Sequence, residues 1–171
     1  FMLMSTYIFD MDERLPLSVT HEVRDRCLCL HLQRAARAVA RRFDEALRPV
    51  GLTNGQYSLL MSLNRPQPPV MGEVAELLAM DRTTLTANLK PLARRGLLEI
   101  VPDETDRRSR RLVLTDAGRD LLALAVPIWR STHDEIDALL GRTDHTALTD
   151  DLAALTQRDA GPAPEPCDPP G

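Results

Sequence analysis

The residues best suited to chemistry form a short run in which hydrogen-bonding side chains stand between two cations. They are Arg82, Thr83, Thr84, Thr86, Asn88 and Lys90. Arginine matches the acceptor edge of guanine and asparagine matches the edge of adenine, whereas lysine and the threonine hydroxyls suit phosphate oxygens. The run therefore points to nucleic acid, although the same residues on their own also fit a solvated helix face.

A second basic cluster, Arg107, Arg108 and Arg110, lies in or beside the polar segment 102–109. Segments 97–101 and 111–114 flank it and have the composition of strands, so a β-hairpin with a charged tip is predicted. Arginines at such a tip suit the minor groove of DNA or its phosphates.

Charge is distributed unevenly along the chain. Residues 81–111 contain eight basic and five acidic residues, a net +3, whereas the whole chain carries −4. The two clusters therefore form a basic patch on an acidic protein, and this local excess is the electrostatic feature that nucleic-acid binding requires.

Several helices must position these clusters. Apolar residues spaced three and four apart predict a helix that begins near Ser18 or Thr20 and runs to Leu47, before Pro49 and Gly51. Thr53 is expected to cap a second helix, which ends before the loop Arg65-Pro66-Gln67-Pro68-Pro69, and a third helix covers 70–78.

The fourth predicted helix carries the first polar run. It spans 82–95, with Asp81 as its cap, Leu85, Leu89 and Leu92 on its buried side, and Gly96 as its stop. After the hairpin, Thr115 caps a helix that ends at Gly141 and that Pro127 is expected to kink or split. A last helix holds Leu148, Leu152 and Leu155.

This order of helices followed by a hairpin predicts a winged helix-turn-helix, a mainly α fold with a small β-hairpin (α+β). Residues 29–118 resemble the MarR family of bacterial transcription regulators. The resemblance rests on Leu52-Thr53 with Gln56-Tyr57, on Ala79-Met80-Asp81-Arg82-Thr83-Thr84-Leu85-Thr86, and on Asp103-Glu104-Thr105-Asp106-Arg107-Arg108 followed by Leu114-Thr115 and Gly118.

The resemblance implies a homodimer on double-stranded DNA, built from the first and the last two helices. It implies that Asp106 braces the wing, that Arg108 enters the minor groove, and that a ligand or redox site lies between the dimer region and the DNA-binding lobe. The expected domains are a flexible arm (1–17), a MarR-like domain (18–158) and a disordered Pro-rich tail (159–171). Within the domain, 18–50 and 116–158 are the dimerisation helices and 53–115 is the DNA-binding lobe.

Cys29 is a candidate redox residue, because it falls where the organic hydroperoxide sensors of this family carry their reactive cysteine. Gln33 and Phe43 stand where those sensors have tyrosines. A small apolar residue on the dimer helix is the other interpretation of Cys29. Trp129, the only tryptophan, is expected in the core or in a pocket wall.

The favoured function is a dimeric repressor that a small-molecule effector releases from an inverted-repeat operator. The alternatives are a redox-sensing regulator acting through Cys29 and a winged-helix module for protein contacts. The sequence has no nucleophile–base set, phosphate loop or metal-ligand spacing, so we expect no enzyme activity, cofactor or metal. It has no segment apolar enough to span a membrane, and its three cysteines fit a reducing cytoplasm.

Overall fold

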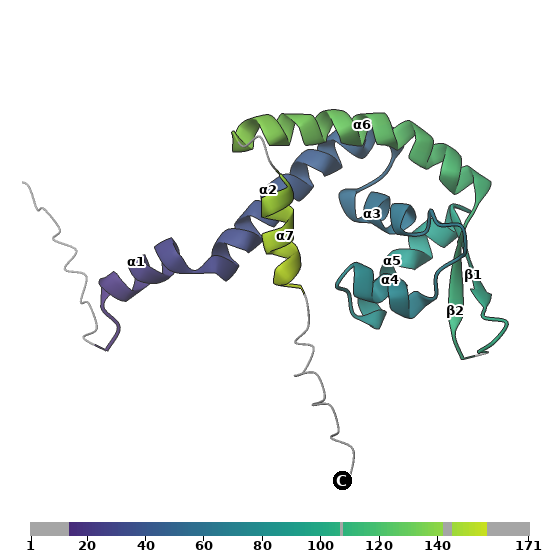
Figure 1. Ribbon diagram of the computed structural model, residues 1–171, viewed down its shortest axis with the longest axis horizontal. Coiled ribbons are helices and arrows are strands. Elements are labelled where there is room, and N and C mark those ends of the chain that lie inside the picture. The colour runs from purple at the N-terminus through teal and green to yellow at the C-terminus, as the bar shows by residue number, and fades with distance from the viewer. Residues whose placement is uncertain (1–13, 107, 142–144, 157–171) are drawn as a thin grey trace, which may run out of the picture. The chain divides into compact units, whose positions relative to one another are not determined.

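The computed structural model describes residues 14–106, 108–141 and 145–156 (Figure 1). The predicted tail, most of the predicted arm and Arg107 lie outside the described residues. The helices are α1 (Leu17–Arg26), α2 (Leu28–Leu47), α3 (Asn54–Ser62), α4 (Met71–Leu77), α5 (Arg82–Arg94), α6 (Asp116–Leu140) and α7 (Thr146–Ala154). A 3-10 turn, η1 (Arg48–Val50), follows α2, and strands β1 (Leu98–Pro102) and β2 (Arg110–Leu114) form the hairpin.

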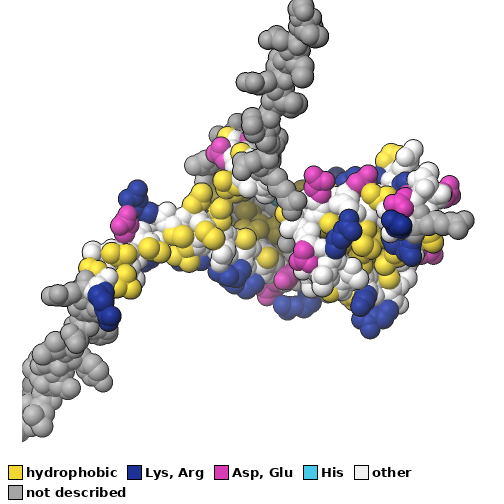
Figure 2. Space-filling model, turned by 90° about the horizontal axis from the view of Figure 1, so that it is seen from below, with side chains coloured by type: hydrophobic (Ala, Val, Ile, Leu, Met, Phe, Trp, Pro, Cys, Tyr) yellow, Lys and Arg dark blue, Asp and Glu magenta, His cyan; other side chains and the backbone are white. Residues whose placement is uncertain are grey.

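The chain divides into two compact units, Phe1–Arg41 and Arg42–Gly171. The sequence predicts a single helix up to Leu47, and this prediction is wrong. Cys27, in the first unit, adopts an extended conformation with ψ 101° and separates α1 from α2. Neither Ser18 nor Thr20 caps α1, whose N-cap is Pro16. No residue of α1 is buried, and Figure 2 shows apolar side chains at the surface of this N-terminal segment.

The second unit holds the core, which consists mainly of leucine. α3 packs against α6, α4 packs against α5, and β1 contacts α5. The largest fully buried side chains are Leu47, Leu59, Leu60, Val74, Leu85, Leu89, Leu92, Leu98 and Leu112. β1 and β2 pair antiparallel from Leu98 opposite Leu114 to Pro102 opposite Arg110, so the hairpin extends out from this core.

Local chemistry sets the helix ends, as the sequence predicts. The side chains of Thr53, Asp81 and Thr115 each accept a hydrogen bond from the backbone N–H three residues ahead, at the starts of α3, α5 and α6. Gly96 and Gly141 follow α5 and α6 with φ of 69° and 59°, the left-handed region that ends helices and favours glycine.

Two expectations need correction. β1 begins and ends one residue later than predicted, at Leu98 and Pro102, and β2 begins one residue earlier than predicted, at Arg110. Of the kink or split expected at Pro127, the split is wrong, because α6 runs as one helix through this residue (Figure 1). A proline removes one backbone hydrogen bond, and a helix of 25 residues packed on α3 retains the rest.

Gly118 lies in the first turn of α6, where the helix passes close to the start of the hairpin. A Cβ at this position would overlap the carbonyl oxygen of Leu97 and lie 2.7 Å from Leu114 Cδ1. A glycine is therefore required for α6 to approach β1 and β2 this closely.

We expect Gly118→Ala to lower the free energy of unfolding by about 1–3 kcal/mol, because the backbone at Leu97 must move to admit the methyl group. Gly55→Ala in α3 is the matched control, since nothing lies within 4 Å of its Cβ. The control should be neutral or stabilising by up to about 1 kcal/mol. Urea unfolding measures both, and equal stability of the two variants would contradict the close approach.

Candidate DNA-binding surface

α5 presents one polar face to solvent because its other face is anchored in the core. Leu85, Leu89 and Leu92 are all 0% exposed. On the opposite side Arg82, Thr83 and Lys90 are exposed, and together with Thr86 and Ala87 they line a shallow depression in the surface. The side chains that the sequence singled out for nucleic acid therefore lie on the solvent side of this helix.

The polar residues of this helix have different roles. Thr84 donates its hydroxyl proton to Asp81 Oδ2 at 2.6 Å, and Thr86 donates its own to the Arg82 carbonyl at 2.7 Å. Asn88 makes only a weak contact, 3.8 Å from its Nδ2 to Met80 Sδ. Among the residues that the structure describes, the Arg82 and Lys90 side chains have no ion pair or hydrogen-bond partner, so both cations are available to a ligand.

The turn between α4 and α5 holds the start of this face in place. Ala79 has a φ of 50°, a left-handed conformation that costs a non-glycine residue about 1–2 kcal/mol. Asp81 then caps α5 by accepting from the Thr84 N–H at 2.8 Å. The hydrogen bonds from the Thr84 hydroxyl and backbone lower the pKa of Asp81, so this carboxylate remains charged at neutral pH.

The hairpin β1–β2, the wing of the predicted fold, is held by a buried carboxylate at the point where β1 meets the connecting loop. Asp103 is 3% exposed, and its Oδ1 accepts from the Thr105 hydroxyl at 2.6 Å and from the Thr105 and Asp106 N–H groups at 2.7 and 2.9 Å. Its Oδ2 pairs with Arg111 Nε at 2.5 Å. These hydrogen bonds, with the Arg111 charge, hold the pKa of Asp103 far below its usual value.

Asp103 therefore holds the wing loop against β2, in addition to the bracing that the family resemblance implies for Asp106. Asp106 is exposed and acts locally, accepting from the Arg108 N–H at 3.0 Å within the loop. Arg108 and Arg110 are both exposed, so the wing presents cations to solvent near its tip.

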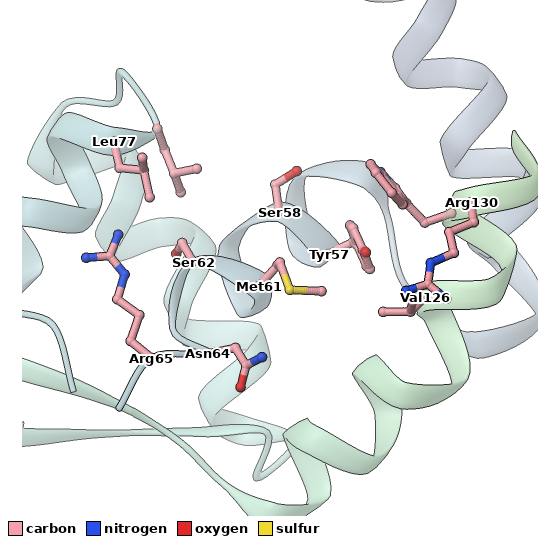
Figure 3. Close-up of a pocket in the computed structure, with 11 residues that line it drawn as sticks. Tyr57, Ser58, Met61, Ser62, Asn64, Arg65, Leu77, Val126 and Arg130 are labelled. Carbon is pink, nitrogen blue, oxygen red and sulfur yellow. The ribbon is translucent and has the colours of Figure 1, made fainter. Parts of the chain in front are cut away.

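A pocket of about 740 Å³ lies between α3, α4 and α6 in the same unit (Figure 3). Its lining residues are Tyr57, Ser58, Met61, Ser62, Asn64, Arg65, Leu77, Leu78, Val126, Trp129 and Arg130. Burial raises the pKa of the Tyr57 phenol, and the positive charge of Arg130 opposes this shift. The pocket thus combines aromatic walls, a neutral phenol and two cations, and its volume is that of small-molecule sites.

The residues match known proteins in both sequence and fold. Residues 50–109 match the model of the MarR family. BadR of Rhodopseudomonas palustris, a transcriptional activatory protein, is 32% identical over 125 residues, which cover 70% of this chain and 71% of BadR. MosR, a transcriptional regulator of Mycobacterium tuberculosis solved in complex with DNA, is 39% identical with a TM-score of 0.70 over 77% of this chain and 95% of MosR.

The chain belongs to the MarR family. It is a winged-helix transcriptional regulator of the MarR type, as the sequence predicts. The repressor CouR of Rhodococcus jostii, solved on a 23-mer DNA duplex, is another structural neighbour at 35% identity, with a TM-score of 0.70 over 80% of this chain and 96% of CouR.

Two groups in this MarR-family chain were not found from the sequence. Asp103 was named only as part of a motif, because its burial depends on Arg111 from the opposite strand. His133 lies in α6 and His145 just before α7, yet both contact the same carboxylate oxygen. His133 Nδ1 lies 3.0 Å and His145 Nε2 lies 3.3 Å from Asp137 Oδ1. The centroid of the Trp129 ring lies 5.0 Å from that of His133 and 6.3 Å from that of Tyr57, on which it is stacked. Trp129 also lines the pocket, which confirms the prediction that it lies in a pocket wall.

Cys29 lies in the first compact unit of this MarR-family chain and is exposed. Gln33 Nε2 donates a hydrogen bond to its sulfur at 3.2 Å, one helical turn ahead. The thiol is therefore accessible to solvent, with one polar group directed at it.

No helix among the described residues is both long and apolar enough to span a membrane.

We expect Asp103→Asn to destabilise this MarR-family fold at neutral pH and to reduce the loss of stability in acid. The folded pKa of Asp103 is depressed, so its contribution is complete above its unfolded pKa of about 3.9 and is lost as pH falls toward the folded value. Thermal melts from neutral pH to strong acid measure this. The melting temperatures of the wild type and of the Asp103→Asn variant should begin to approach each other as pH falls below about 4 and should meet only in strong acid, and parallel curves would contradict the assignment.

Proposed function

We propose that this protein is a homodimeric repressor that binds an inverted-repeat operator through α5 and the β1–β2 wing, and that a small molecule in the α3–α4–α6 pocket releases it. It acts in the cytoplasm and has no catalytic role. The observation that carries the proposal is the solvent-facing side of α5, where Arg82 and Lys90 have no partner among the described residues.

The chemistry of α5 supports direct contact with bases. Arg82 stands at the first turn, where the positive end of the helix dipole adds to its charge, and Thr83 lies beside it. Thr84 and Thr86 use their hydroxyl protons inside the helix, so we assign their oxygens and methyl groups, rather than their protons, to base or phosphate contacts. Asn88 and Lys90 extend the surface by one further turn.

The wing supplies the second part of the proposed interface. Arg108 and Arg110 extend the basic surface beyond α5, and we assign Arg107 to the same contact. Asp106 orients the backbone of Arg108 through its hydrogen bond. MosR and CouR, at 39% and 35% identity, were both solved on DNA, which supports the same use of this surface here. A protein-interaction module is less suited to this basic surface.

The pocket supports effector control. Arg65 and Arg130 offer positive charge at its edge, and Tyr57 and Trp129 form an aromatic wall. An effector with a flat apolar body and an acidic group matches this lining. The direction of regulation differs among relatives, since CouR is a repressor and BadR an activator, and repression is the direction that we propose.

Exposed apolar residues support the homodimer. Neither α1 nor α7 buries any residue within one chain. Leu139 and Leu155 are 66% and 57% exposed, near the ends of α6 and α7. Short helices with solvent-exposed leucines have marginal stability in water. A second copy of the chain that buries these leucines would stabilise them.

A second candidate function is redox control through Cys29. Its exposure favours reaction with an oxidant, because thiol oxidation needs access to the sulfur.

We expect Arg82→Ala to reduce operator affinity roughly 5- to 100-fold through loss of a base contact. Arg108→Ala should reduce it too, and should lower the slope of log affinity against log salt by about one. Arg119→Ala, which removes an exposed arginine paired with Asp116 on α6, is the control and should bind as the wild type does. Fluorescence anisotropy at several salt concentrations measures this, and unchanged affinity in both test variants would refute the assigned contacts.

We expect the double variant Leu139→Asp, Leu155→Asp to sediment as a monomer, because it introduces charge into the proposed dimer interface. Ile100→Asp on β1 also adds a charge at an exposed apolar residue, 40% exposed, but outside that interface, and it should remain dimeric. Analytical ultracentrifugation gives the mass of each. A double variant that sediments at the wild-type dimer mass would contradict this interface.

If Cys29 is a redox switch, peroxide should weaken DNA binding by the wild type, and Cys29→Ser should bind DNA normally but no longer respond. Cys27→Ser is the control for general thiol effects. An operator titration with and without peroxide decides between the two candidate functions. Release of DNA by oxidised Cys29→Ser protein would exclude Cys29 as the switch.

A further inference from the structure

The loop between α3 and α4 touches the pocket at one end and the wing at the other. Asn64 and Arg65, at its start, line the pocket. At its end, the Leu112 N–H of β2 donates to the Pro69 carbonyl at 3.0 Å, and Val70 forms an isolated β-bridge with Arg111. One short segment of backbone therefore connects the two parts of the proposed regulator.

Proline makes this segment stiff. Pro66, Pro68 and Pro69 fix φ near −65°, and each proline also restricts the residue that precedes it. A stiff segment shifts as a body when one end is displaced, whereas a glycine-rich loop would absorb the displacement through its own dihedral angles.

Arg111 is the side chain that fastens this segment to the wing. Its Nη1 donates to the Pro68 carbonyl at 2.7 Å, and its Nε pairs with Asp103 Oδ2 at 2.5 Å. Asp103 in turn holds the Thr105 and Asp106 backbone at the base of the wing loop. One guanidinium thus bonds to the loop and, through Asp103, to the wing that carries Arg108.

We propose that Arg111 is the positioning residue that couples the pocket to the wing, through the stiff loop 64–70 on one side and Asp103 on the other. This inference rests on the proposed function, since it takes the pocket as the effector site and the wing as part of the DNA contact. A pocket occupant that displaces Arg65 shifts the Pro68 carbonyl, and Arg111 transmits that shift to the wing.

Coupling between two sites is reciprocal, so DNA on the wing must alter the pocket even when no effector is present. Trp129 is the only tryptophan in the chain and it lines the pocket. Its fluorescence therefore reports the pocket alone. A second physical route exists through α4, which packs on α5 and supplies Leu77 and Leu78 to the pocket.

The experiment titrates the full chain with labelled duplex DNA from beside its own gene. The fluorescence anisotropy of the DNA measures binding. At DNA saturation, the emission maximum and the acrylamide quenching of Trp129 report the pocket. Arg111→Lys keeps a charge for Asp103 but replaces the two guanidinium nitrogens that bond Asp103 and Pro68 with a single nitrogen on a flexible chain. Pro66→Gly loosens the exposed part of the loop and leaves every Arg111 bond in place, so it decides the matter if Arg111→Lys fails to fold. Arg119→Lys is the matched control, because it makes the same substitution at an arginine that contacts neither the loop nor Asp103.

We expect DNA to change the Trp129 signal in the wild type and in Arg119→Lys, and expect both Arg111→Lys and Pro66→Gly to lose more than half of that change at DNA saturation. A full change in both test variants would overturn the proposal and favour the route through α4. DNA binding by the wild type without any Trp129 change would also overturn it, while leaving the proposed function intact. If the anisotropy shows no DNA binding by the wild type, both the proposed function and this inference are wrong.

Discussion

Burial of Leu85, Leu89 and Leu92 along one side of α5 determines which side of that helix faces solvent. Each of these side chains is fully buried, which stabilises the fold by about 1.5–3 kcal/mol per leucine. Their spacing leaves Arg82 and Lys90 on the outer face. The apolar core therefore decides the rotation of the helix, and the chemistry of the outer face follows from that rotation.

The wing depends on this core in a different way, since a two-stranded hairpin is marginally stable by itself. Asp103 and Arg111 join its two strands beside the connecting loop, and Arg111 also binds the Pro68 carbonyl. In this pair Asp103 is buried and Arg111 is 35% exposed, and it contributes orientation more than net stability because desolvation of the carboxylate offsets the attraction. The wing arginines thus extend from a base that is attached to both α4 and the core.

The order of the elements could be predicted from the sequence because its signals are local. Asp81 and Thr115 mark helix starts, Gly96 and Gly141 mark helix ends, and the leucine spacing identifies the buried face of α5. The break at Cys27 could not be predicted, since no proline or glycine marks it. The role of Asp103 was missed because its ion-pair partner, Arg111, lies on the opposite strand and meets it only in the folded chain. The pocket, likewise, is assembled from three helices distant in sequence.

The most direct test of the account is a hydroxyl-radical footprint of the purified protein on the intergenic DNA beside its own gene. A homodimer that binds an inverted repeat predicts two symmetric blocks of protected DNA whose centres lie about one helical turn, ~10 base pairs, apart. Each block would contain one major groove for α5 and a neighbouring minor groove for the wing. A single unsymmetrical block, or no protection at protein concentrations that saturate the anisotropy signal, would contradict it.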